Sequence, residues 1–557
     1  MPTAACVVRS AVPLTSELTI SSFRAPRPRR RSAAGLVAAT LVTGGLLVGT
    51  GGTSTAARPA TGLGVDLATA TTQSLQAGLS AGTFSSKELV AAYLERIGDL
   101  NSSGPGLNAV RAINPDAYAE AVRADTARKQ GRSRGPLSGI PVLLKDNIDV
   151  AGMPTTAGAY ALKDSYPKAD APVVTQLRAA GAIILGKTNL SEFANFLTSG
   201  MPAGYSSLGG QVLNPYDTSV TPSGSSAGSG AAMAAALGAA TVGTETSGSI
   251  LSPSAANSLV AVKPTVGLIP RTGIIPISAT QDTAGPMVRS VYDAAAMLSG
   301  MSGDDAEDSA TTGGPATNTD YTKALSDTAL AGKRLGYIPN NDPNFLKALD
   351  VLRAQGATLV SVTTPQAAGA SILNYEFKRD LNAYLARLPE NAPRKTLADV
   401  IAYNETNPAV TTKFGMSLLT QSQAIDVSPG SPETVKYEAD KATGLTSSRT
   451  GIDAVLTRGT ATKDDDLSAI VSPQSTTGVG ARAGYPTVMV PNGYAAATRR
   501  PVPLSFLGTA YSEGTLLGLA YDFEQAAKDY AWEPPSAVNP SLFRCVDAKT
   551  APADCAP

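Results

Sequence analysis

Residues 173–196 read VVTQLRAAGAIILGKTNLSEFANF and carry the clearest signal of the fold class. They predict a helix, a buried strand over residues 182–185, a glycine turn and a second helix. Earlier, SSKELVAAYLERI at 85–97 predicts a helix that begins with a capping box formed by Ser85 and Glu88. IPVLL at 140–144 predicts a strand that ends directly before Lys145. This alternation predicts one large α/β domain with a mixed, mostly parallel central sheet covered by helices.

The second half of the chain continues the same alternation. Helical patterns fill residues 371–450, which we expect to cover the sheet as a lid. We place the whole domain at 58–540. The stretches that extend the alternation are strand 333–339, helix 345–356, strand 357–362 and two late strands at 467–473 and 485–491 that return to the sheet.

Residues 1–57 have the composition of an export signal. An arginine cluster at 29–31 precedes a weakly apolar run, and small residues follow around Ala56 and Ala57. This order predicts a twin-arginine signal that is removed, rather than a membrane anchor that is kept. We therefore expect a secreted, extracellular protein.

A tail at 541–557 contains Cys545 and Cys555. In an exported protein a pair of cysteines suggests a disulfide, although two free thiols are also possible. The sequence leaves both open and favours the bridge.

The composition excludes several classes of protein. The chain contains no histidine, which rules out serine and cysteine nucleophiles that depend on imidazole, and zinc sites built on it. Lysine and arginine number 45 and so do aspartate and glutamate, so we expect no nucleic-acid partner and no stable membrane association after signal removal. A base that works near neutral pH must then be a carboxylate or a deprotonated amine.

Small residues dominate the stretch 219–270, which we interpret as buried core lining a site around a helix at 228–237. Gly224-Ser225-Ser226-Ala227-Gly228 fits the esterase elbow G-x-S-x-G, but without histidine Ser226 has no partner base. Ser165-Tyr166-Pro167-Lys168 fits the S-x-x-K pattern of serine β-lactam enzymes, although Pro167 is hard to place in the helix that this spacing needs.

Three motifs occur in a fixed order: LLKDNI at 143–148, SGSSAGS at 223–229 and GTETSGSI at 243–250. From Lys145 to Ser225 there are 80 residues, and from Ser225 to Ser249 there are 24. In these motifs the chain resembles the amidase signature family, and with QDTAGPMVRSVYDAA and GTAYSE it resembles most the bacterial peptide amidases. The resemblance implies a mixed sheet of roughly eleven strands.

The resemblance also implies the roles of individual residues. The acyl-forming serine matches Ser249, the bridging serine Ser225 and the base Lys145, and the peptide bond Gly224–Ser225 is expected to be cis. Lys145 must then be neutral in the resting enzyme, which burial at the end of an apolar strand favours. Lys187 and Lys263 are rival bases. The backbone N–H groups that face the oxyanion match Thr246, Ser247, Gly248 and Ser249.

The expected function is hydrolysis of a carboxamide, on a carboxyl-terminally amidated peptide or a small amide, to a carboxylate and ammonia. No cofactor or metal is expected, and the oligomeric state stays open. The A subunit of glutamyl-tRNA amidotransferase has the same motifs, but the export signal and the neutral surface argue against that role. The sequence also allows a secreted non-catalytic binding protein on the same scaffold, an enzyme of this family that acts on other amides or esters, and a β-lactam enzyme that uses Ser165.

Overall fold

The computed structural model describes residues 63–314, 319–458, 466–474 and 477–539, all within one compact unit, Arg58–Pro557. The predicted export signal at 1–57 and the predicted tail at 541–557, with Cys545 and Cys555, lie outside the described residues.

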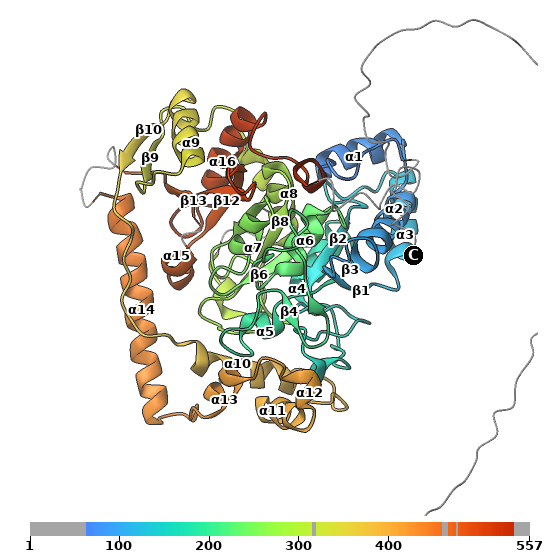
Figure 1. Ribbon diagram of the computed structural model, residues 1–557, viewed down its shortest axis with the longest axis vertical. Helices are drawn as coiled ribbons and strands as arrows, with labels where there is room; N and C mark the ends of the chain where they lie inside the picture. The colour runs from blue at the N-terminus through green and yellow to red at the C-terminus, as the bar shows by residue number, and fades with distance from the viewer. Residues whose placement is uncertain (1–62, 315–318, 459–465, 475–476, 540–557) are drawn as a thin grey trace, which may run out of the picture. The chain divides into compact units, whose positions relative to one another are not determined.

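An eleven-stranded sheet forms the centre of the domain (Figure 1). Its order is β1-β3-β2-β6-β8-β7-β12-β13-β11-β9-β10. A second, two-stranded sheet pairs β4 (Tyr205–Ser206) with β5 (Gly210–Gln211). The strands of the large sheet are β1 (Val110–Ile113), β2 (Pro141–Lys145), β3 (Ile183–Thr188), β6 (Ala240–Glu245), β7 (Val260–Lys263), β8 (Thr283–Val288), β9 (Arg334–Tyr337), β10 (Thr358–Ser361), β11 (Ala469–Ser472), β12 (Thr487–Tyr494) and β13 (Pro501–Leu507).

Parallel pairing is concentrated in two parts of the large sheet. Strand β2 is parallel to both β3 and β6, and β9 is parallel to both β10 and β11. The other neighbours in the described sheet are antiparallel: β1 pairs with β3 at one edge, and β8, β7, β12 and β13 join the two parallel groups. The predicted α/β class, the single domain and the mixed sheet are confirmed, as are the two late strands that return to it.

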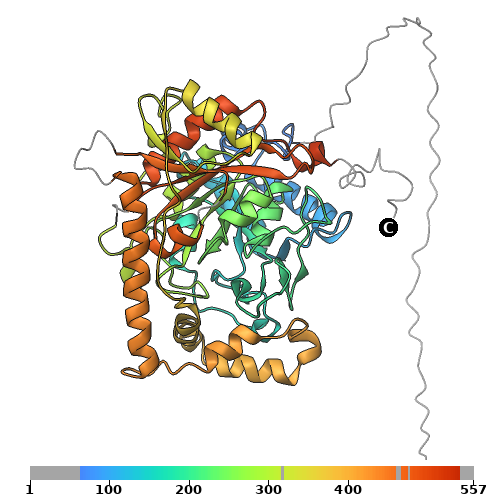
Figure 2. The same cartoon turned by 60° about the vertical axis from the view of Figure 1, so that its left-hand side comes forward.

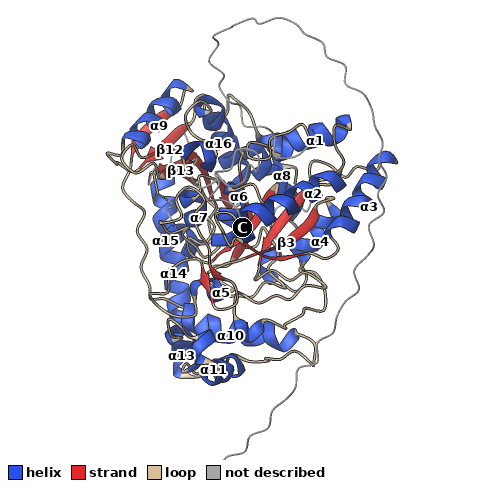
Figure 3. Ribbon diagram, turned by 45° about the vertical axis from the view of Figure 1, so that its right-hand side comes forward, coloured by secondary structure: helices blue, strands red, loops and turns tan. Residues whose placement is uncertain are grey.

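Helices flank the sheet (Figure 3). None of the described helices combines the length and the apolar character that a membrane span needs. The helices are α1 (Thr72–Ala81), α2 (Ser86–Ile97), α3 (Ala117–Lys129), α4 (Pro172–Ala179), α5 (Glu192–Asn195), α6 (Ala227–Ala234), α7 (Leu251–Ala256), α8 (Val291–Met301), α9 (Pro343–Ala354), α10 (Leu373–Arg387), α11 (Leu397–Thr406), α12 (Pro408–Thr411), α13 (Ser417–Gln423), α14 (Pro432–Leu456), α15 (Thr477–Ala483), α16 (Glu513–Ala527) and α17 (Pro535–Val538).

The capping box predicted at the start of α2 is present. Ser85 Oγ accepts a hydrogen bond from Glu88 N at 3.2 Å, and Glu88 Oε2 accepts one from Ser85 N at 2.8 Å. Two of the first N–H groups of the helix, which have no partner inside it, are thereby satisfied.

The predicted glycine turn after β3 is wrong. Gly186 lies inside the strand, which runs on to Thr188. A Cβ atom at Gly186 would lie 2.2 Å from the carbonyl oxygen of Ala112 in β1. Glycine is needed here because another backbone passes close by, and the sequence alone does not separate that use from a turn.

The prediction of a regular helix after β3 is also wrong. Phe193, Ala194 and Asn195 have φ values of 49°, 54° and 73°, so the chain forms a left-handed turn where α5 was expected to continue. The turn directs the buried ring of Phe193 against Phe377 of α10, with ring centroids 6.0 Å apart. Packing with α10 thus overrides the local helical pattern.

The predicted cover consists of helices α10 to α14. Helices α10 to α13 lie together, and the long helix α14 runs along one side of the domain (Figures 1 and 2). A separate apolar cluster joins α10, α11 and α13 to the left-handed turn and to Ile275 and Ile277. The cover is therefore packed on the segment that precedes β8.

Candidate active site

Lys145 ends strand β2 and is fully buried, with an exposed fraction of 0 %. Its Nζ lies 2.8 Å from Ser225 Oγ, 2.9 Å from Thr244 Oγ1 and 3.1 Å from Thr244 O. Burial lowers the pKa of Lys145 from its ordinary value of 10.5 to about 7, while the carboxylates of Asp282 and Glu245 act in the opposite direction. A large share of this lysine is thus an uncharged amine near neutral pH.

Ser225 lies on the turn that leads into helix α6, and the peptide bond Gly224–Ser225 is cis, as the resemblance implies. The carbonyl oxygen of Ser225 accepts a hydrogen bond from Ser191 N at 3.0 Å. Ser226 Oγ instead donates to Thr244 O at 3.1 Å and accepts from Thr244 N at 3.2 Å. Of the two neighbouring hydroxyls, Ser225 is therefore the one that contacts Lys145.

Ser249 lies on the turn between β6 and α7, and 9 % of it is exposed. Its carbonyl oxygen accepts a hydrogen bond from Ser226 N at 3.2 Å, which links this turn to the one that carries Ser225. Glu245 Oε2 accepts hydrogen bonds from the N–H groups of Ile250 and Leu251, at 2.8 and 3.0 Å. The carboxylate fixes the chain directly after Ser249.

The backbone N–H groups of residues 246–249 have no hydrogen-bond partner within the described part of the chain. Gly248 has a φ of 89°, a conformation that favours glycine and lets successive N–H groups turn the same way. We call residues 246–249 the oxyanion turn. Free N–H groups beside a hydroxyl are what stabilisation of a tetrahedral oxyanion requires.

The rival lysines lie apart from these serines. Lys187 Nζ pairs with Asp146 Oδ1 at 3.3 Å and also donates to Ile148 O. Lys263 Nζ donates to Pro264 O at 2.9 Å. Among the hydrogen bonds of the described residues, only Lys145 of these three lysines reaches a candidate serine.

The S-x-x-K pattern is not assembled. Ser165 is buried whereas Lys168 is exposed, and helix α4 begins only at Pro172. The two side chains are not on one helical face, so this arrangement lacks the geometry of a serine β-lactam enzyme.

Two polar side chains around Lys145 had no predicted role. Thr244 Oγ1 accepts hydrogen bonds from both Lys145 and Asn147, the latter at 3.0 Å. Both residues lie in the motifs quoted above, but spacing alone gives no sign of their contact. Among the described residues, no three histidine, cysteine, aspartate or glutamate side chains gather as metal ligands do.

Asp282 is a further site residue without a predicted role, from the segment QDTAGP. Its Oδ1 accepts a hydrogen bond from Thr246 Oγ1. Burial raises the pKa of Asp282 to about 6, although the hydrogen bonds that it accepts oppose the shift. Asp282 thus reaches the first residue of the oxyanion turn.

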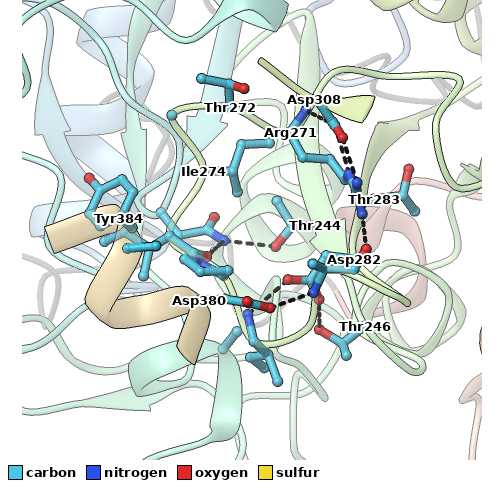
Figure 4. A pocket seen from close by; sticks show the side chains of 18 of the residues that line it. Thr244, Thr246, Arg271, Thr272, Ile274, Asp282, Thr283, Asp308, Asp380 and Tyr384 are labelled. Atoms are coloured by element: carbon cyan, nitrogen blue, oxygen red, sulfur yellow. Dashed lines mark hydrogen bonds and ion pairs between the residues drawn. The ribbon is translucent and has the colours of Figure 1, made fainter. Parts of the chain in front are cut away.

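A cavity of about 220 Å³ adjoins the site (Figure 4). Thr244 and Thr246 line it, together with Asp380 and Tyr384 of α10. Residues 274–277 add an apolar wall. The charged side chains that line the cavity are largely paired within the protein, as in the ion pair of Arg271 with Asp308. Asp308, a buried side chain of the segment after α8, thus lines the cavity.

Comparison with known proteins agrees with this geometry. The profile of the family described as Amidase matches residues 88–517. A probable amidase of Arabidopsis thaliana is 39 % identical over 481 residues, which cover 82 % of this chain and 90 % of that protein. The structure of the native peptide amidase from Stenotrophomonas maltophilia superposes with a TM-score of 0.77 at 41 % identity, covering 84 % of this chain and 98 % of that one.

A more limited match links the chain to the A subunit of the glutamyl-tRNA(Gln) amidotransferase from Chloroflexus aurantiacus. Identity is 40 % over 306 residues, which cover 53 % of this chain and 60 % of that protein. The family profile matches most of the chain, and the Arabidopsis and Stenotrophomonas proteins match it over nearly their whole length. The chain therefore belongs to the amidase signature family and is an amidase, a hydrolase of carbon–nitrogen bonds.

Proposed function

We propose that the protein hydrolyses a terminal carboxamide, on an amidated peptide or a small amide, through a relay of Ser249, Ser225 and Lys145. The observation that carries this proposal is the 2.8 Å hydrogen bond between Lys145 Nζ and Ser225 Oγ, made by a buried lysine whose pKa is about 7. Similarity to the Stenotrophomonas peptide amidase supports the substrate class.

In the first half of the reaction, Ser249 Oγ attacks the carbonyl carbon of the amide. Ser225 Oγ takes the proton of Ser249 and passes its own proton to Lys145 Nζ, which becomes an ammonium. The oxyanion that forms accepts hydrogen bonds from the free N–H groups of residues 246–249.

In the second half, the proton of Lys145 returns through Ser225 to the leaving nitrogen, and ammonia departs. The acyl group stays on Ser249 as an ester, which a water molecule then hydrolyses with the same base. The two oxygens of Thr244 stabilise the ammonium while it exists. The relay needs neither metal nor cofactor.

Ammonia release from a carboxyl-terminally amidated dipeptide tests the proposal. We expect turnover by the unaltered protein, a loss of about 10⁴-fold or more in Ser249→Ala, and no ammonia from the same dipeptide as a free acid. Free glutamine is the comparison substrate, because turnover of glutamine in place of the dipeptide amide would indicate a glutaminase. Equal ammonia release by the unaltered protein and by Ser249→Ala would contradict the proposal.

We also propose that residues 1–57 direct export, on the basis of their arginine cluster and apolar run. Replacement of Arg29, Arg30 and Arg31 by lysine in the full chain tests this, since twin-arginine export depends on those side chains. The expected result is loss of the protein from the culture medium. Undiminished secretion would contradict it.

A further inference from the structure

Residues 277–282, which we call the connecting loop, lie between the cover and the oxyanion turn. On the side of the turn, Asp282 Oδ1 accepts from Thr246 Oγ1, and Gln281 Nε2 donates to Thr246 O at 3.2 Å. Figure 4 shows Asp282 beside Thr246 at the edge of the cavity. The position of Thr246 therefore depends on the position of this loop.

Asp282 also holds the connecting loop together. Its Oδ2 accepts hydrogen bonds from the N–H groups of Ile277 and Ser278, at 2.8 and 2.9 Å. The N–H of Asp282 in turn donates to Ser278 O at 2.9 Å. One carboxylate thus joins the loop to the turn, and any shift of the loop at Ser278 is passed on to Thr246.

On the side of the cover, Glu376 of α10 holds the same loop. Glu376 is fully buried, with an exposed fraction of 0 %, and its Oε2 accepts from Ser278 Oγ and from Thr280 N, the latter at 3.2 Å. Its Oε1 accepts from Thr280 Oγ1 at 2.6 Å. One helical turn further on, Asp380 Oδ2 accepts from Ala279 N at 2.8 Å. Two carboxylates of α10 thus bind three consecutive loop residues.

Two further groups fix the carboxylate of Glu376 itself. Tyr437 of α14 donates to its Oε1 at 2.6 Å, and Arg379 Nη2 lies 3.2 Å from the same oxygen. Burial opposes ionisation of Glu376, but the hydrogen bonds from Ser278, Thr280 and Tyr437 outweigh it and lower its pKa. A buried, ionised carboxylate with donors on every side has little freedom to move.

We propose that Glu376 is a positioning residue of the reaction: it fixes the connecting loop, and through Asp282 and Gln281 it fixes the oxyanion turn. Glu376 touches no reacting atom, so it acts only through these contacts. The inference rests on the proposed role of residues 246–249. The competing view is that Glu376 merely attaches the cover to the domain.

The experiment compares Glu376→Ala, Glu376→Gln and Thr280→Val with Ser417→Ala. Thr280→Val removes one hydrogen bond to Glu376 from the side of the loop and keeps the volume of the side chain. Ser417→Ala is the matched control, because Ser417 Oγ lies 2.9 Å from Thr198 Oγ1 and joins the cover to the domain away from the connecting loop.

Two readouts are measured on each variant: steady-state kinetics with an amidated dipeptide, and amide hydrogen exchange by mass spectrometry. We expect kcat to fall about 100-fold in Glu376→Ala and about tenfold in Glu376→Gln and Thr280→Val, with KM within about threefold, because a misplaced oxyanion donor weakens only the transition state. Exchange should rise both in residues 277–282 and in residues 246–250, and Ser417→Ala should change neither quantity by more than about twofold.

A role in attachment alone predicts faster exchange in α10 with unchanged exchange in 246–250 and an unchanged kcat, and that result would overturn the inference. Hydrogen exchange does not depend on turnover. Failure of this inference is therefore distinguishable from failure of the proposed function, which would show as no ammonia release by the unaltered protein.

Discussion

Thr244 holds Lys145 from two sides, because its hydroxyl lies 2.9 Å and its main-chain carbonyl 3.1 Å from Lys145 Nζ. Ser225 Oγ takes the third position, at 2.8 Å. A neutral amine can donate to the two oxygens of Thr244 and accept the proton of Ser225, and an ammonium can donate to all three. The same geometry therefore serves both protonation states that the proposed relay needs.

The pH dependence of kcat/KM should follow the amine of Lys145. Because its pKa is about 7, we expect kcat/KM to rise about tenfold per pH unit below pH 7 and to level off above it. Lys263→Met is the control, since Lys263 is also buried with a pKa lowered to about 8 but contacts neither serine. If the rise of kcat/KM with pH below pH 7 disappeared in Lys263→Met, Lys263 would be the base.

Folding stability should depend on pH through the same group. The pKa of Lys145 is lower in the folded protein than in the unfolded chain, so between about pH 7 and pH 10.5 the unfolded chain binds the extra proton. The free energy of unfolding, relative to Lys145→Met, should then rise with pH by about 1.4 kcal/mol per unit in this window. Urea unfolding of both proteins at several pH values measures this difference. The prediction would be refuted if the free energies of unfolding of the two proteins changed with pH in parallel.

Loss of the Thr244 hydroxyl should lower kcat/KM more than loss of another buried hydroxyl does. Thr244→Val removes one acceptor of the Lys145 ammonium, so we expect kcat/KM to fall about tenfold and the midpoint of the acid limb to move to lower pH. Thr241→Val is the matched control on the same strand, because the Thr241 hydroxyl is also buried and donates to Met287 O at 2.8 Å. Equal losses of activity in the two variants would assign Thr244 a structural role only.

The close approach of β1 to β3 can be tested by stability. A methyl group at Gly186 would lie 2.2 Å from Ala112 O, so Gly186→Ala should lower the free energy of unfolding by about 1 to 3 kcal/mol. Gly98→Ala is the control, since its Cβ would meet nothing within 4 Å and its φ of −54° suits any residue. Thermal unfolding compares the two, and an unchanged midpoint in Gly186→Ala would contradict the strand assignment.

Much of the fold could be predicted from the sequence, because local signals and tertiary structure agree there. The capping box of Ser85, the buried strand before Lys145 and the late strands all carry patterns that burial reinforces. Gly186 and the turn at Phe193 departed from prediction because a neighbouring strand and helix α10, both distant in the sequence, decide their conformation.

In the candidate site, too, some residues could be predicted from the sequence and others could not. Lys145 and Ser225 could be named because their motifs resemble those of the family, and the two residues meet in the structure. Thr244, Asp282 and Glu376 could not, because their roles arise from hydrogen bonds between segments up to about a hundred residues apart. The lack of histidine excluded imidazole and left a carboxylate or a deprotonated amine as the base, and the resemblance to the family then pointed to Lys145.

In the proposed mechanism Ser249 is the nucleophile, activated through Ser225 by Lys145. Mass spectrometry of the protein after reaction with a fluorophosphonate tests it most directly, because the reagent stays bonded to the serine that attacks it. We expect a single adduct on Ser249, formed fastest above about pH 7 and nearly absent in Lys145→Met. An adduct on Ser225, Ser226 or Ser165 instead, or undiminished labelling of Ser249 in Lys145→Met, would contradict it.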